Sequence, residues 1–283
     1  MTPESSDRLA LAIHLVLRVG VFALLAWLGM MLFPFLMFPI AGLLVTSALS
    51  TFAAAAVANA VSVRAFERGS LADLGLVWSR TSSRELFAGA GLGAAAAILL
   101  LSVPLALGLA RFAPSQKADH PWGAFLFVTV TLLFGAVGEE LLFHGYAFQL
   151  LVRRIGAFAT ILPAGVLFGL AHIGNQNATN LGIFNTMAWG ILLGYAYART
   201  RALWLPIGLH FGWNFALPLF GVNLSGFTMG VTGYALQWSA GDLWSGGGYG
   251  PEGGLPTTLV VIALPFAVRL LVRSGDEEVT GDA

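Results

Sequence analysis

Cysteine and charge are what this sequence most lacks. It contains no cysteine, which excludes disulfides, thiolate metal sites and a cysteine nucleophile. Only 10% of its 283 residues are charged, whereas about a quarter are charged in a typical soluble domain. The formal net charge is zero, so the sequence gives no electrostatic case for binding nucleic acid. With so few charges the chain cannot cover a water-facing surface, and we expect a polytopic membrane protein.

Apolar runs fill most of the chain, which is 57% hydrophobic. A helix that crosses a bilayer needs roughly 20 mainly apolar residues. The first run is too long for the core of a signal peptide and another follows at once, so we expect it to be retained. The sequence therefore predicts an all-α, polytopic membrane helical bundle, a single domain over 1–275, with a disordered acidic tail at 276–283. We expect about eight transmembrane helices, near 9–33, 38–62, 86–110, 122–146, 157–173, 182–198, 203–220 and 255–272.

The distribution of basic residues predicts the orientation. Cytoplasmic connections of membrane proteins carry an excess of Lys and Arg. If the N-terminus is cytoplasmic and the spans alternate, only Arg111 and Lys117 fall outside, together with the glycine-rich connection 221–254. We therefore expect a multi-pass protein of the cell membrane with both termini in the cytoplasm. The cytoplasmic side then collects Arg8, Arg18, Arg64, Arg68, Arg80, Arg84, Arg153, Arg154, Arg199, Arg201, Arg269 and Arg273.

Two adjacent acids, Glu139 and Glu140, follow an uncharged apolar run at 122–138. A carboxylate in hydrocarbon costs at least ~2.5 kcal/mol, so such a residue indicates a functional site. Two carboxylates side by side cannot both ionise cheaply, because like charges raise one pKa. On a helix Glu140 shares a face with His144, while Glu139 points about 100° away. One acid can therefore face a cavity while the other contacts a neighbouring helix.

Three more polar side chains lie in later apolar runs. His172 ends one run, and His210 and Asn214 are four residues apart, so both project from one helix face. Taken singly, each has a structural explanation, as a solvated histidine at the membrane boundary or an interhelical hydrogen-bond pair. Beside the acid pair, these residues are better explained as parts of one site.

Two kinds of amide hydrolysis fit these residues. In one, Glu139, His172 and His210 hold a catalytic zinc ion, and the second carboxylate is the general base. In the other no metal takes part: Glu139 or Glu140 accepts a proton from water, and a histidine orients that water or protonates the leaving amine. His210 and Asn214 would then donate hydrogen bonds to the oxyanion. Sequence spacing does not separate the two mechanisms.

These residues occur in an order that resembles the CPBP family of intramembrane proteases. That family includes the type II CAAX prenyl endopeptidases and the bacterial Abi proteins linked to bacteriocin self-immunity. The resemblance covers roughly 120–220. Each motif is weak alone, but three in this order within apolar segments are fairly specific. The motifs read Glu139-Glu140-Leu-Leu-Phe-His144, Phe168-Gly-Leu-Ala-His172 and His210-Phe-Gly-Trp-Asn214.

The resemblance implies a bundle of about eight spans whose site opens to the membrane, and a substrate that is a membrane-associated peptide, with CAAX-type tails one such class. It implies that Glu139 acts as the base on water, that His172 assists, and that His210 and Asn214 form the oxyanion hole. Family members have been discussed both as metalloproteases and as glutamate proteases, so the cofactor is either zinc or none.

One departure matters: His144 stands where the family has an arginine. Histidine has neither the permanent charge of arginine nor its pair of parallel hydrogen-bond donors. We therefore expect Glu140 to have a weaker or pH-dependent partner.

Two other functions remain open on sequence grounds. The His144 departure favours a non-catalytic membrane partner or immunity-type protein, which would use the same polar cluster for binding. A proton-coupled transporter would also suit two acids in the membrane, although the absence of internal repeats is unfavourable for it.

The depth of the site poses a geometric problem. If Arg153 and Arg154 mark the cytoplasmic surface, an unbroken helix at ~1.5 Å per residue places Glu139 about 20 Å above it. His210, shortly after Arg201, would lie nearer that surface. We therefore expect a helix break at Gly145 or Pro206, or a tilted span. Irregular backbone is tolerated at that depth where it lines a cavity.

Overall fold

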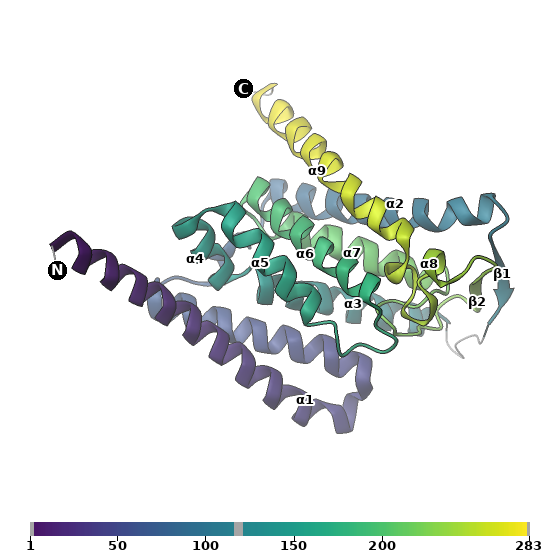
Figure 1. Ribbon diagram of the computed structural model, residues 1–283, viewed down its shortest axis with the longest axis horizontal. Helices are drawn as coiled ribbons and strands as arrows, with labels where there is room; N and C mark the ends of the chain where they lie inside the picture. Colours follow the sequence, from purple (N-terminus) through teal and green to yellow (C-terminus); the bar gives the residue numbers. More distant parts are fainter. Residues whose placement is uncertain (1–2, 116–120, 282–283) are drawn as a thin grey trace.

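The chain folds as an all-α bundle, which confirms the predicted class (Figure 1). The computed structural model describes the backbone of residues 3–115 and 121–281, and the side chains of 7–115 and 122–272, so Lys117 lies outside the described residues. The long helices are α1 (Pro3–Phe66), α2 (Arg80–Ala106), α3 (Pro121–His144), α4 (Tyr146–Ile155), α5 (Ala157–Leu170), α6 (Asn180–Thr200), α7 (Trp204–Leu219) and α9 (Leu255–Gly281). The short elements are η1 (Leu71–Leu74), β1 (Ala110–Pro114), β2 (Tyr234–Trp238), α8 (Asp242–Ser245), η2 (Gly247–Tyr249) and η3 (Pro251–Gly253).

Every predicted span coincides with a helix, and two of them, 9–33 and 38–62, both lie in α1. Figure 1 shows α1 as two arms that fold back on each other. The reversal is at Gly42, whose φ of 68° and ψ of 174° are open to glycine and costly for other residues. The predicted break between these spans, at 34–37, is helical backbone instead, as are Pro34 and Pro39.

Five helical segments are long and apolar enough to span a bilayer by length and composition. At 14 and 16 residues, α5 and α7 are shorter than the roughly 20 that a perpendicular crossing needs. The protein is therefore a membrane protein, and of its two short apolar helices α7 is enclosed by the bundle, whereas α5 exposes Phe158 and Leu167. The five segments are 7–66, 80–106, 122–155, 180–200 and 255–272.

Close packing of α7 against α2 fixes the helix that carries His210. Glycines alternate across the contact: a Cβ on Gly208 would meet the backbone oxygen of Leu86, and one on Gly93 would meet that of Leu209. Small residues let membrane helices approach closely and gain van der Waals contact. As a result α7 is almost entirely enclosed, and Trp213 is only 1% exposed.

The expected helix break occurs at Gly145, between α3 and α4. Asn59 of α1 stabilises it: its Nδ2 donates to the carbonyls of Ala55 (2.7 Å) and Leu141 (2.8 Å), and its Oδ1 accepts from the backbone N–H of Tyr146 (2.7 Å). The break shortens the helix beyond Glu139 to five residues, or about 8 Å. Helix α4 then turns away, with Arg153 and Arg154 exposed in its last turn. The unbroken helix on which the expected separation of about 20 Å was based is therefore not present.

The connection from 220 to 254, which we call the cap, folds onto the bundle rather than forming an open loop. Its strand β2 pairs antiparallel with β1, a two-stranded sheet that the sequence did not predict, because α2 ends at Ala106 rather than at 110. The side-chain amide of Asn185 on α6 donates to the carbonyls of Glu252 (2.8 Å) and Gly254 (3.0 Å). The end of the cap is thus bonded to the bundle at a buried point.

The C-terminal segment is helical backbone as far as Gly281, as the continuation of α9. The disordered tail predicted for 276–283 therefore overlaps this helix. Residues 282–283 and the side chains from 273 onward lie outside the described residues, so the tail remains a prediction.

The α2–α7 contact predicts a difference between two identical substitutions on one helix. Gly93→Ala places a Cβ 2.8 Å from the backbone nitrogen of Trp213, so we expect overpacking that costs about 1–3 kcal/mol. Gly91→Ala is the control, because a Cβ there meets nothing within 4 Å. Thermal unfolding in detergent should show a lower Tm for Gly93→Ala only. Equal Tm values would contradict the close packing.

Candidate active site

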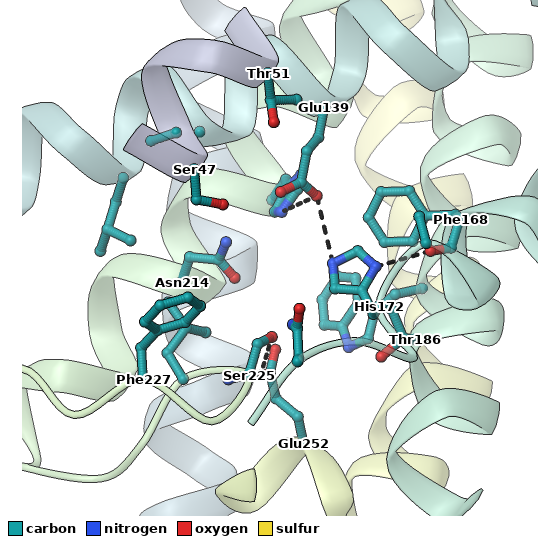
Figure 2. A pocket seen from close by; sticks show the side chains of 18 of the residues that line it. Ser47, Thr51, Glu139, Phe168, His172, Thr186, Asn214, Ser225, Phe227 and Glu252 are labelled. Atoms are coloured by element: carbon teal, nitrogen blue, oxygen red, sulfur yellow. Dashed lines mark hydrogen bonds and ion pairs between the residues drawn. The ribbon is translucent and has the colours of Figure 1, made fainter. Parts of the chain in front are cut away.

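A cavity of about 210 Å³ lies among the helices where the predicted polar residues meet. Helices α1, α3, α6 and α7 form its walls, with the α5–α6 connection at one side and the cap at another. Figure 2 shows the side chains converging on it. Of the predicted residues, Glu139, His172, His210 and Asn214 line the cavity, whereas Glu140 and His144 lie behind it.

Glu139 faces two histidines across short gaps. Its Oε2 lies 3.7 Å from Nε2 of His172 and 3.8 Å from Nε2 of His210. These separations exceed direct hydrogen-bond length but suit a small polar molecule between them. The Oε2 atom itself is buried and has no hydrogen-bond partner among the described residues. The side chain of Glu139 as a whole is 27% exposed, so the carboxylate is reachable from the cavity.

Hydrogen bonds fix the orientation of both imidazole rings. Nδ1 of His172 lies 2.8 Å from the carbonyl oxygen of Phe168, which can only accept. Nδ1 of His210 lies 2.9 Å from Oε1 of Glu140, also an acceptor when ionised. The proton of each neutral ring is therefore on Nδ1, and the Nε2 lone pair points toward Glu139. Two lone pairs and one carboxylate oxygen thus converge at one point.

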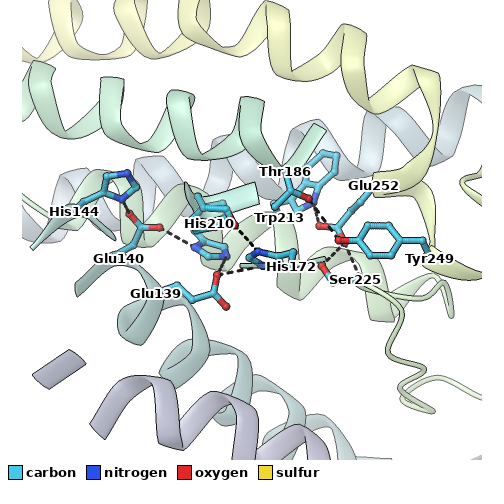
Figure 3. A network of polar contacts seen from close by, with 11 residues as sticks. Glu139, Glu140, His144, His172, Thr186, His210, Trp213, Ser225, Tyr249 and Glu252 are labelled. Carbon is cyan, nitrogen blue, oxygen red and sulfur yellow. Dashed lines mark hydrogen bonds and ion pairs between the residues drawn. The ribbon is translucent and has the colours of Figure 1, made fainter. Parts of the chain in front are cut away.

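Glu140 is the anchor of this arrangement and not a cavity residue (Figure 3). It is 0% exposed, and its Oε2 lies 2.7 Å from Nδ1 of His144 while its Oε1 contacts His210. The residue at the family's arginine position therefore still bonds the second acid of the pair. Glu140 joins α3 to α7 and orients the ring of His210.

Asn214 lies one turn beyond His210 on α7 and lines the same cavity. Figure 2 shows its amide turned into the cavity near Ser47. An amide donor beside an imidazole is an arrangement that can stabilise a developing oxyanion.

The three residues predicted as zinc ligands are close together but do not form a metal site. Zinc bonds of ~2.0–2.1 Å in a tetrahedron bring ligand atoms to within about 3.4 Å of one another. The carboxylate–imidazole separations here are 3.7 and 3.8 Å. Across residues 7–115 and 122–272, no group of three or more His, Cys, Asp or Glu side chains has metal-binding geometry. As they stand, the three atoms are spaced for a bridging water molecule and do not close around one ion.

Glu252 of the cap is a cavity residue that sequence reasoning missed. It is 8% exposed, and its Oε1 accepts from Nε1 of Trp213 (3.2 Å). Its Oε2 accepts from both the backbone N–H (2.6 Å) and the hydroxyl (2.8 Å) of Ser225. An acid in a polar, glycine-rich connection carries no sequence signal, unlike an acid in an apolar run. Glu252 fastens the cap to α7 directly over the cavity.

The buried phenol of Tyr249 completes the polar side of the cap (Figure 3). Its ring is fully buried, and its hydroxyl lies 3.5 Å from the hydroxyl of Thr186. Burial, followed by the nearby charge of Glu252, raises the pKa of Tyr249 to about 12. The phenol is therefore protonated at neutral pH and remains a hydrogen-bond donor.

The bonding of Glu252 predicts that its neutral isostere destabilises the fold. Glu252→Gln replaces one accepting oxygen with an NH₂ group, which leaves a buried donor of Trp213 or Ser225 unpaired. We expect a loss of about 1–3 kcal/mol in the free energy of unfolding. Asp242→Asn is the matched control, an exposed acid in the same cap. If chemical denaturation gave both variants the wild-type midpoint, Glu252 would not hold the cap.

Comparisons with known proteins find membrane peptidases that resemble the part of the chain carrying this site. The family model described as type II CAAX prenyl endopeptidase Rce1-like matches residues 121–216, the region that carries all three motifs. The chain is also 29% identical over 89 residues to the "Putative membrane peptidase YdiL" of Bacillus subtilis (strain 168). That match covers 31% of this chain and 34% of the relative, so the chain aligns with about a third of that protein. No solved structure matches the chain.

Proposed function

We propose that this chain, which belongs to the CPBP family, is an intramembrane endopeptidase that uses Glu139 to activate water. The observation that carries the proposal is the approach of Glu139 Oε2 to two imidazole Nε2 atoms within one cavity. A water molecule between these three atoms would have the two to four polar partners that a buried water needs. Its protons would lie toward Glu139 and one imidazole.

The hydrolysis follows from these positions. Glu139 accepts a proton from the water, and the oxygen attacks the carbonyl carbon of the scissile amide. The carbonyl oxygen becomes an oxyanion, to which the Asn214 amide donates. His210 adds a second donor only as the imidazolium, in which Nδ1 donates to Glu140 and Nε2 carries the additional proton. When the C–N bond breaks, the proton held by Glu139 passes to the leaving amine, directly or through His172.

Glu140 and His144 act in this proposal as positioning residues. Neither lines the cavity, and both are fully buried. Because His144 still bonds Glu140 at 2.7 Å, replacing the family's arginine does not leave that acid unpaired. The main argument for a non-catalytic immunity-type protein is thereby weakened.

The substrate in this proposal is a peptide at or within the bilayer. The cavity is mixed in character, with apolar side chains from α1 and α3 beside the polar groups. The name of the matching family model makes prenylated CAAX tails the first class to test. We further propose a location in the cell membrane with both termini in the cytoplasm, on the evidence of the arginine distribution.

The central test is cleavage of a membrane-tethered peptide library, with prenylated and unprenylated members. We expect Glu139→Gln to lower the rate by about 10²–10⁴, the usual contribution of a general base. Glu85→Gln is the control, the same change on α2 outside the cavity. A zinc chelator should leave wild-type cleavage intact, and loss on chelation would replace the metal-free mechanism. A folded wild type that cleaves nothing would favour the binding function instead.

Asn214 should affect the transition state more than substrate binding. Asn214→Ala removes one oxyanion donor, so we expect kcat to fall by about 10²–10³ with little change in KM. Asn180→Ala, at the exposed start of α6, serves as the control. A rise in KM alone would mean that Asn214 binds substrate and does not stabilise the oxyanion.

A further inference from the structure

A second cavity, of about 450 Å³, lies at the arginine-rich end of the bundle, away from the residues of the first. Four segments meet there: the first arm of α1, the end of its second arm, the connection through η1, and α4. Helix α4, which begins after the break at Gly145, supplies Tyr146, Arg153 and Arg154 to the cavity wall. The polar side chains that line the cavity are Arg18, Glu67, Asp73, Tyr146, Arg153 and Arg154.

The two acids in this cavity are already bonded to protein donors. Oε1 of Glu67 accepts from Nη1 of Arg18 at 2.9 Å and from the hydroxyl of Tyr146 at 3.4 Å. Oδ2 of Asp73 accepts from the backbone N–H of Ser70 at 2.7 Å, as part of the cap of η1. These carboxylates therefore have fixed structural roles at the wall.

Three arginines but only two acids line the cavity. Within the described part of the chain, Arg153 and Arg154 have no hydrogen bond or ion pair with another side chain, and both are exposed. Arg18 uses one nitrogen for Glu67 and another, at 3.4 Å, for the carbonyl of Phe66, so donors remain on its guanidinium. Arg153 and Arg154 leave α4 about 100° apart, but both line the cavity together with Arg18, so the cavity carries an excess of positive charge.

We propose that this cavity binds the phosphate group of an anionic phospholipid. Arginine is suited to phosphate because its planar fork donates two parallel hydrogen bonds to two oxygens. Basic pockets between membrane helices at the cytoplasmic side are recognition sites for such headgroups. A volume of about 450 Å³ lies in the usual range of small-molecule sites, ~300–1,000 Å³. The headgroup phosphate would lie between Arg153, Arg154 and Arg18.

The surroundings favour a lipid over a soluble phosphate. Leu17, beside Arg18, is 53% exposed, and Ile155, beside Arg154, is 51% exposed. These exposed apolar side chains flank the cavity's arginines in the sequence and would contact acyl chains, whereas a soluble anion would gain nothing from them. Helix α4 buries one face and exposes its two arginines, which is the arrangement of a helix lying at a membrane surface.

The test measures lipid binding directly and does not depend on proteolysis. The full-length protein in lipid-free detergent is titrated with short-chain phosphatidylglycerol or phosphatidylcholine, and bound lipid is counted by native mass spectrometry. We expect phosphatidylglycerol to bind more tightly, and the double variant Arg153→Gln/Arg154→Gln to lose about tenfold or more in that affinity. The matched control is Arg80→Gln/Arg199→Gln, two exposed arginines that do not line the cavity.

A charge-preserving variant guards against misfolding. Arg153→Lys/Arg154→Lys should keep part of the preference for phosphatidylglycerol, and all variants should retain the wild-type Tm. Equal binding of the two lipids, or equal weakening by both glutamine pairs, would overturn the proposal. Displacement of phosphatidylglycerol by inorganic phosphate at equal concentration would keep the phosphate site but overturn its assignment to a lipid.

Discussion

A single buried carboxylate, that of Glu140, is the constraint on which the site depends. A charge removed from water is tolerated only where hydrogen bonds and partners replace its hydration. Here those partners are His144 on its own helix and His210 on α7, at 2.7 and 2.9 Å. Helices α3 and α7 must therefore meet at this level, and the ring of His210 must present Nε2 to the cavity. The position of Glu139 one residue earlier then follows from helix geometry.

The two acids illustrate how one dipeptide can supply two different environments. Glu140 is enclosed and fully bonded, while Glu139 is 27% exposed and has an unpartnered oxygen. Their side chains leave the helix about 100° apart, so one faces the bundle and the other the cavity. In the proposed mechanism the two acids have different roles: Glu140 positions His210, and Glu139 accepts the proton of the water. The repulsion between the two neighbouring carboxylates is reduced, because Glu139 reaches the cavity while Glu140 is buried against two histidines.

Much of this arrangement could be predicted from the sequence, for identifiable reasons. Long apolar runs indicate the helices, and Glu139, His172, His210 and Asn214 are conspicuous because polar groups are rare in such runs. The break at Gly145 was one of three expected ways to bring them together. The two spans at 9–33 and 38–62 predict a break at 34–37, but the reversal of α1 occurs at Gly42, because a positive φ reverses the chain and proline is tolerated in membrane helices. Glu252 and the β1–β2 pairing depend on long-range packing, which local pattern does not encode.

Because the cap contributes to its wall, the cavity is lined by residues from most of the length of the chain. Its lining runs from Met30 in the first arm of α1 to Glu252, just before the last helix. During synthesis the ribosome delivers these segments in order, at about 5–20 residues per second. The proposed catalytic groups of α3 and α7 can meet only after residue 214 has entered the membrane, and the wall above them closes only when Glu252 arrives. If the proposed function is right, a nascent chain would thus lack a closed hydrolytic cavity until its insertion is almost complete, which would delay any self-cleavage of its own exposed helices.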